Sequence, residues 1–155
     1  MLSYNIRPAM QDEWEDAMSL AWLVFSKFEA KEYDEEGTKS FLEFISDNVL
    51  FKMFKKGIYK LFVAVEGNKI IGLISLRDKN HISLLFVDEH YHKMGIGRDL
   101  IQYVQMFLFE EQGIRCCTVN AAPYAIGFYH KLGFCDMGDR CISDGIIYTP
   151  MKKEW

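Results

Sequence analysis

The stretch Leu84–Leu100, LLFVDEHYHKMGIGRDL, joins an apolar segment to a turn with two glycines and then to an amphipathic segment. Residues 83–87 have the composition of the end of a buried strand. The apolar residues after the turn recur at the spacing of one helix face, as Leu100, Ile101, Val104, Phe107 and Leu108. The stretch therefore predicts a strand, a glycine turn and a helix in direct succession.

Gly95 and Gly97 give this turn a chemical use as well as a structural one. A residue without a Cβ lets backbone N–H groups approach a ligand at the positive end of a helix, which favours a phosphate or pyrophosphate. An ordinary turn would use the same glycines, so the pair alone leaves both interpretations open. The Lys-Ser/Thr of a P-loop is absent, and Arg98 and Leu100 stand where a dinucleotide fingerprint would place its third glycine. This pattern argues against a dinucleotide-binding oxidoreductase.

A second stretch, Asn120–Phe134, reads NAAPYAIGFYHKLGF. Together the two stretches resemble the GNAT superfamily of acyl-CoA-dependent N-acetyltransferases. That family carries Val-x-Pro-x-x-(Gln/Arg)-x-x-Gly-x-(Gly/Ala) at the end of its fourth strand and, later, Asn-x-x-Ala-x-x-Phe-Tyr-x-x-x-Gly-Phe. The matching residues, in order and spacing, are Val87, Gly95, Gly97, Ala125, Phe128, Tyr129, Gly133 and Phe134.

Three positions depart from the family pattern. Glu89 replaces the Pro, His92 the Gln/Arg and Ala122 the Asn. The resemblance covers residues 61–155, while the first sixty residues agree in their helix-rich character. It implies an α/β fold, a single GNAT-like domain over residues 1–155. We expect a mixed, largely antiparallel sheet of about seven strands, flanked by about four helices and splayed between strands four and five.

The order of elements follows from periodicity, turn residues and caps. Thr38 is the expected cap of a second helix, and Asp47 or Asn48 that of a third. The charged segment 29–37 is expected to be a loop. The predicted strands are 3–7, 61–65, 70–76, 81–87, 115–120, 134–137 and 146–151, and the other predicted helices are 13–29, 95–112 and 124–132.

Composition limits the partners. A chain of 155 residues with 50% hydrophobic content can bury one core, and a net charge of −4 argues against sequence-independent nucleic-acid binding. The longest apolar runs are too short to span a bilayer, so we expect no membrane association and a cytoplasmic protein. The four cysteines and the pair His90 and His92 lack metal-ligand spacing, so we expect reduced thiols and no metal.

The resemblance also implies a coenzyme A site. Pantetheine would lie along Leu85, Phe86 and Val87, and the pyrophosphate would reach the turn and the helix start. Asn120 lies close to the missing Asn, and Tyr129 would contact the cofactor as well. The residues of the turn are His92, Lys93, Met94, Gly95, Ile96, Gly97 and Arg98, of which Lys93 and Arg98 add positive charge.

Acyl transfer to an amine needs a donor for the oxyanion, a proton for the leaving thiolate and a neutral amine. By resemblance, the N–H of Val87 serves the oxyanion and Tyr129 the thiolate, with an ordinary phenol pKa near 10. The base is open. His81 and Cys117 stand where some relatives have a Glu, and His81 is the candidate base, although loss of the proton to water would also suffice.

The acceptor is the least specified partner. In the family, the first helices cover the acceptor site. Here they carry the aromatic residues Trp22, Phe25, Phe28, Tyr33 and Phe41 beside the acidic residues Glu29, Glu32, Asp34, Glu35 and Glu36. These residues suit a cationic amine, or form a solvated acidic loop over ordinary core aromatics.

Two functions follow from these observations. The first is an N-acetyltransferase that transfers an acetyl group directly from acetyl-CoA to a primary amine in a ternary complex. The acceptor would be a small amine, an amino acid, a polyamine, an aminoglycoside or a protein amine. The alternative is a non-catalytic acyl-CoA-binding or regulatory domain, suggested by Ala122 and the missing Glu base. A homodimer, common among relatives, stays open.

Overall fold

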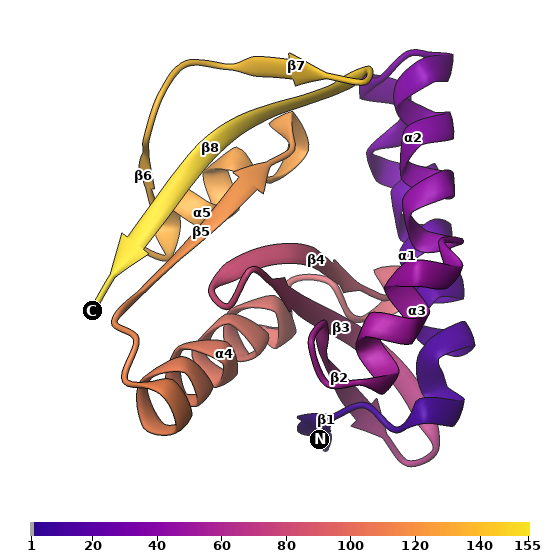
Figure 1. The fold of residues 1–155 in the computed structure, drawn as a ribbon, viewed down its shortest axis with the longest axis vertical. Helices are drawn as coiled ribbons and strands as arrows, with labels where there is room; N and C mark the ends of the chain where they lie inside the picture. Colours follow the sequence, from indigo (N-terminus) through magenta and orange to yellow (C-terminus); the bar gives the residue numbers. More distant parts are fainter. Residues whose placement is uncertain (1) are drawn as a thin grey trace.

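A mixed β-sheet runs through the molecule, and helices cover both of its faces (Figure 1). The computed structural model describes residues 2–155. The helices in that range are α1 (Trp14–Phe28), α2 (Glu35–Ile45), α3 (Asn48–Lys55), α4 (Ile96–Gln112) and α5 (Ile126–Lys131). The strands are β1 (Asn5–Pro8), β2 (Lys60–Glu66), β3 (Lys69–Arg77), β4 (His81–Val87), β5 (Cys116–Ala121), β6 (Cys135–Asp136), β7 (Cys141–Ser143) and β8 (Ile146–Glu154).

The strand order is β1-β2-β3-β4-β5-β8-β6, with β7 paired to β8. Every pair is antiparallel except β4 and β5, which are joined by the α4 crossover. The mixed, largely antiparallel sheet is therefore confirmed. The described residues hold eight strands, against about seven predicted, because β7 is too short, at three residues, to give a strand pattern. They hold five α-helices, against about four predicted.

Strands β4 and β5 pair only at their beginnings. The register joins His81 to Thr118 and Ile82 to Val119 and goes no further. Beyond this point the two strands separate, which confirms the predicted splay, while β4 stays paired to β3 up to Val87. The last residues of β4 therefore have backbone groups with no strand partner on one side.

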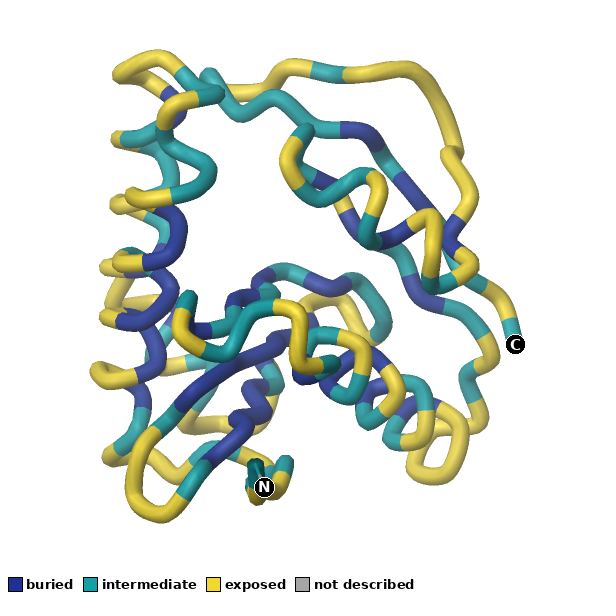
Figure 2. Tube along the Cα trace, turned by 180° about the vertical axis from the view of Figure 1, so that it is seen from behind, coloured by how far each residue is buried: buried dark blue, intermediate teal, exposed yellow. Residues whose placement is uncertain are grey.

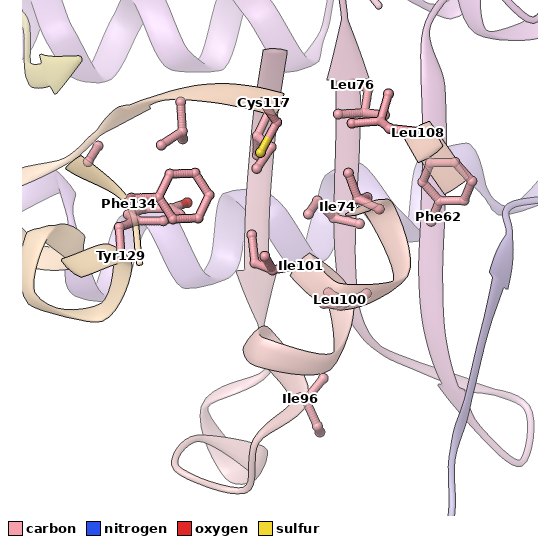
Figure 3. Close-up of a cluster of buried hydrophobic side chains, with 14 of the residues drawn as sticks. Phe62, Ile74, Leu76, Ile96, Leu100, Ile101, Leu108, Cys117, Tyr129 and Phe134 are labelled. Atoms are coloured by element: carbon pink, nitrogen blue, oxygen red, sulfur yellow. The ribbon is translucent and has the colours of Figure 1, made fainter. Parts of the chain in front are cut away.

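Two hydrophobic clusters hold the sheet between its helices. On one face α4 packs against the central strands, where Figure 3 shows Leu100 and Ile101 beside Ile74 of β3. On the other face α1 contributes Ala17 and Phe25, which are fully buried. Figure 2 shows buried and exposed segments alternating along the long helices α1 and α4. No helix within residues 2–155 is both long and apolar enough to cross a bilayer.

The second helix begins earlier than predicted. The N-cap of α2 is Asp34, whose side chain accepts the N–H of Gly37 at 2.9 Å, so Thr38 lies inside the helix. Much of the segment 29–37, predicted as a loop, is helical: η2 (Ala30–Glu32) is a 3-10 turn, and Glu35 opens α2. Acidic residues in a first helical turn are favoured by the helix dipole, which accounts for the difference.

We expect Asp34→Ala to lower the free energy of unfolding by about 1 kcal/mol, because the N–H of Gly37 would lose its cap. Urea denaturation of the two proteins measures the change. Asp34→Asn is the matched control, since an amide oxygen can still accept this hydrogen bond. An equal loss in both variants would assign the effect to charge and contradict the capping role.

The β7–β8 hairpin reaches across to α2, as Figures 1 and 2 both show. The hydroxyl of Ser40 donates a hydrogen bond to the carbonyl of Asp144 at the hairpin tip, at 2.8 Å. Gly37 of α2 and Gly145 of the tip lie backbone against backbone. These contacts connect the half of the sheet that contains β5, β8 and β6 to the helix α2.

Candidate active site

A cavity of about 330 Å³ lies where β4 and β5 separate. Its walls are the end of α1, the unpaired end of β4, the turn before α4, and η4 (Pro123–Ala125) with α5. The structure brings ten of the predicted site residues to this cavity: Leu85, Phe86, Val87, His92, Lys93, Gly95, Ile96, Gly97, Arg98 and Tyr129.

The unpaired edge of β4 presents backbone groups to the cavity. The N–H of Asp88 donates to the carbonyl of Ile71 at 2.9 Å. The backbone N–H of Asp88 therefore points toward β3. Backbone groups alternate in direction along a strand, and the N–H groups of Leu85 and Val87 therefore point to the opposite, unpaired side. The carbonyl of Val87 also points to the unpaired side, because it accepts a hydrogen bond from Nε2 of His92 at 2.7 Å and not from β3.

The turn before α4 combines left-handed backbone with two basic side chains. Gly95, the N-cap, has φ +86°, and Lys93 has φ +65°, both in the left-handed region. Gly95 has no side chain to cap the helix, so the first-turn N–H groups of α4 have no internal acceptor. Lys93 and Arg98 line the same cavity and add positive charge.

Gly97 is required for close packing of this turn. A Cβ at that position would lie 3.0 Å from Cζ of Phe128, on the opposite wall of the cavity. The glycine therefore lets the α4 N-terminus approach α5. Met94, in contrast, is 53% exposed and does not line the cavity, because the turn directs its side chain to solvent.

Tyr129 lies deep in the wall of the cavity. Its side chain is 5% exposed, and its ring packs edge-on to Phe128 and Phe134, with centroids at 5.2 Å in both pairs. Figure 3 shows Tyr129 beside Phe134. Burial, and then the charges of Glu29 and Cys117, raise the pKa of the phenol well above its ordinary value. The expectation of an ordinary pKa is corrected, and the hydroxyl stays protonated at every physiological pH.

Glu29 shares this cavity. The sequence named it among five acidic residues that suit a cationic amine, but it did not single Glu29 out. Burial, and then the neighbouring Glu32, raise the pKa of its carboxyl to about 7. The sequence placed Glu29 in an acidic run with four other carboxylates. Its one distinguishing signal is that it directly follows the apolar face of α1, which ends in Phe25 and Phe28.

His81 and Asn120 lie in a different place. Both line a second cavity of about 480 Å³ between α2, the start of β4 and β8. Nδ1 of His81 is 2.7 Å from Oγ1 of Thr118, and burial, followed by Arg77, lowers the pKa of the imidazole to about 4. Asn120 is directed away from the first cavity because side chains alternate along β5, and its neighbours Val119 and Ala121 face the α4 side.

The two cavities share β4 as a wall. Ile82, Ser83 and Leu84 line the second cavity, and the next three residues line the first. The structure therefore offers adjoining sites, one lined by the glycine turn and one closed by the contact between α2 and the hairpin.

Comparison with solved structures shows the same fold elsewhere. A GCN5-related N-acetyltransferase from Rhodopseudomonas palustris superposes with a TM-score of 0.84 at 22% identity, over 100% of this chain and 98% of that chain. The PaiA N-acetyltransferase of Thermoplasma acidophilum, in complex with coenzyme A, gives a TM-score of 0.79 at 20% identity, over 99% and 100% of the two chains.

Sequence comparison gives the family. A Bacillus subtilis (strain 168) protein with a provisional acetyltransferase name is 26% identical over 95 residues, which span 59% of this chain and 64% of that relative. The match thus covers less than two thirds of the relative's length. The family model described as an acetyltransferase (GNAT) domain matches residues 29–155. This match spans most of the chain, and the protein therefore belongs to the GNAT acetyltransferase family.

Proposed function

We propose that this protein is an N-acetyltransferase that transfers an acetyl group from acetyl-CoA directly to a primary amine in a ternary complex. One observation carries the proposal. A single cavity joins the unpaired edge of β4, the glycine turn before α4 and the buried phenol of Tyr129. Family membership supports the reaction class. In this proposal the acceptor approaches through the second cavity, whose lining on β4 ends where that of the first begins.

The residues present fit coenzyme A. The N–H groups of Leu85 and Val87 would bind the pantetheine amides as a strand partner would. The first-turn amides of α4, with Lys93 and Arg98, would bind the pyrophosphate. Because Gly97 has no Cβ, the turn can lie close to Phe128 on the other wall of the cavity.

Coenzyme A would supply the acetyl group as a thioester. In this proposal the N–H of Val87 donates a hydrogen bond to the thioester carbonyl, where negative charge develops during attack. The phenol of Tyr129 donates its proton toward the sulfur as the thiol leaves. Its surroundings are apolar and it remains protonated, so the donor is present throughout the working pH range.

A free-thiol assay with acetyl-CoA tests the proposal. The acceptor panel consists of spermidine, kanamycin, free amino acids, and peptides with either a free α-amino group or a lysine. We expect thiol release that depends on both protein and amine, together with an acetylated product by mass spectrometry. Absence of thiol release with the whole panel would contradict the enzymatic function.

A non-catalytic acyl-CoA-binding domain is the second candidate. The observation that favours it is Ala122, which stands where the family motif has an Asn. Tight acetyl-CoA binding by calorimetry, with no turnover of any amine, would support this candidate over the first.

We expect the double variant Lys93→Gln, Arg98→Gln to raise the Kd for CoA about tenfold at low salt, a loss of about 1.4 kcal/mol. Both side chains border the proposed pyrophosphate site, and added salt would narrow the difference from wild type. Isothermal titration calorimetry with CoA at two salt concentrations measures both Kd values and their salt dependence. Lys131→Gln, which removes an exposed cation on α5, is the control. An unchanged Kd in the double variant would place the phosphates elsewhere.

A further inference from the structure

Glu29 is the one carboxylate among the described residues that line the first cavity. It follows α1 directly, and its neighbours on the cavity wall include the end of β4 and Tyr129. Its negative charge acts on Tyr129, whose phenol pKa it helps to raise. The carboxylate of Glu29, at the end of α1, and the phenol of Tyr129, on α5, therefore line the same cavity.

The Glu29 side chain has no partner within residues 2–155. The nearby acids are engaged: Glu32 accepts the N–H of Tyr124 at 3.1 Å, and Glu89 forms an ion pair with Lys27. No hydrogen bond or ion pair of this kind reaches the Glu29 carboxylate from the described part of the chain. Glu29 is half-buried, and a cationic ligand in the cavity would give its carboxylate an ionic partner.

The structure holds Glu29 in place without using its side chain. Its N–H donates to the carbonyl of Phe25 at 2.9 Å, which continues the helix. The ring of the preceding residue, Phe28, packs against two residues of the cavity wall, with centroids 5.0 Å from His92 and 5.7 Å from Tyr124. The carboxylate is thus pre-positioned while its oxygens stay free to react.

The surroundings set its protonation state. Burial, and then Glu32, raise the pKa of Glu29 to about 7, so the group changes charge near neutral pH. A base with a pKa near the working pH is the most effective one. The other titratable groups that face it are Glu32 and Tyr33 after α1, Tyr129 on α5, Tyr124 on η4, Tyr91, His92 and Lys93 before α4, and Arg98 in its first turn.

We infer that Glu29 is the catalytic base of the proposed acetyl transfer, accepting a proton from the ammonium form of the acceptor. This inference rests on the proposed function. Glu29 takes one of the three ammonium protons and later releases it to solvent. The freed nitrogen lone pair forms the bond to the acetyl carbon as the carbon–sulfur bond breaks. A second proton passes through the Tyr129 phenol to the leaving sulfur, and the third stays on the amide nitrogen.

His81 is the weaker candidate for this role. It lines the second cavity and is hydrogen-bonded to Thr118. Its lowered pKa, about 4, leaves it a poor proton acceptor. Glu29, in contrast, shares a cavity with the proposed acid and with the strand edge that would bind the thioester.

The first test needs no substrate. A carbon-13 titration of the Glu side-chain carboxyls in the ligand-free protein, assigned with Glu29→Gln, should show Glu29 titrating near pH 7. Glu36→Gln is the matched control, since it removes an exposed carboxylate of the same segment. A Glu29 midpoint near the ordinary 4.5 would overturn the inference, whatever the activity.

The second test is the pH profile of kcat/KM with the panel amine that the wild type acetylates fastest. We expect Glu29→Gln to lower kcat/KM about a hundredfold at pH 7.5 and to remove the rise through pH 7, with CoA affinity unchanged. Glu29→Asp should keep the rise at a reduced rate, and Glu36→Gln should match wild type.

The outcomes separate the inference from the proposed function. Wild-type turnover with an unchanged rate and pH profile in Glu29→Gln would overturn the role of Glu29 and leave the acetyltransferase standing. No turnover of any amine by the wild type would overturn the proposed function and this inference with it.

Discussion

We expect Tyr129→Phe to lower kcat about a hundredfold while the Kd for CoA changes less than twofold. Phenylalanine keeps the ring that packs edge-on to Phe128 and Phe134, so the wall of the cavity is preserved. Only the hydroxyl is removed, and with it the proton donor for the leaving sulfur. Steady-state kinetics with acetyl-CoA and calorimetry with CoA measure the two quantities separately.

The pH dependence of this step has a definite sign. Burial raises the pKa of Tyr129, so the phenol gains no charge as the pH rises through 10, where an ordinary phenol would lose its proton. We therefore expect no alkaline loss of rate from Tyr129 in the wild type below pH 10.

Tyr124→Phe provides the matched control for Tyr129→Phe. Tyr124 also lines the cavity but is 51% exposed, so its hydroxyl can be replaced by water and its loss should change kcat less than threefold. If Tyr129→Phe turned over at the wild-type rate, the acid would have to be another group, and the catalytic part of the proposed mechanism would fail.

We expect Gly37→Val to lower the free energy of unfolding by about 3 kcal/mol, the upper end of the range for overpacking. A Cβ at Gly37 would lie within 2.9 Å of the carbonyl carbon of Gly145 and of Cβ of Tyr33, and closer still to the Gly145 carbonyl oxygen. Backbone atoms cannot rotate out of the way as a side chain can. The α2 helix and the β7–β8 hairpin would therefore have to separate.

Thermal unfolding measures this loss. For a chain of 155 residues, about 3 kcal/mol corresponds to a Tm lowered by roughly 6–12 °C. Gly127→Ala is the control, because a Cβ at that position in α5 would meet nothing within 4 Å, and alanine is the better helix former. A Gly37→Val protein that melts with the wild type would show that the contact between helix and hairpin is dispensable.

The same substitution has a functional consequence. The second cavity is lined from both sides of this contact, by Ser40 and Phe41 of α2 and by Ser143 and Asp144 of the hairpin. Separating the two elements should raise KM for the amine while leaving the Kd for CoA unchanged, since the first cavity is built from other segments.

Local sequence was sufficient wherever neighbours along the chain decide the conformation. The apolar run before Asp88, the glycines at 95 and 97 and the helical spacing after them give β4, its turn and α4 as the structure has them. The α4 crossover then makes β4 and β5 parallel neighbours, which was also predicted. The failures are at short or polar elements. β7 is three residues long, and α2 begins in an acidic run whose cap, Asp34, competes with Thr38.

Sequence by itself determined the fold family, the glycine turn and the choice of Tyr129 as a candidate site residue, because each is encoded in a short stretch with fixed spacing. Only the tertiary structure decided which carboxylate of the acidic run enters the cavity and which side of the sheet Asn120 and His81 face. The burial of Glu29, which is the first cause of its raised pKa, arises from α1, β4 and α5 together. These segments are far apart in the chain, and no local pattern records how they meet.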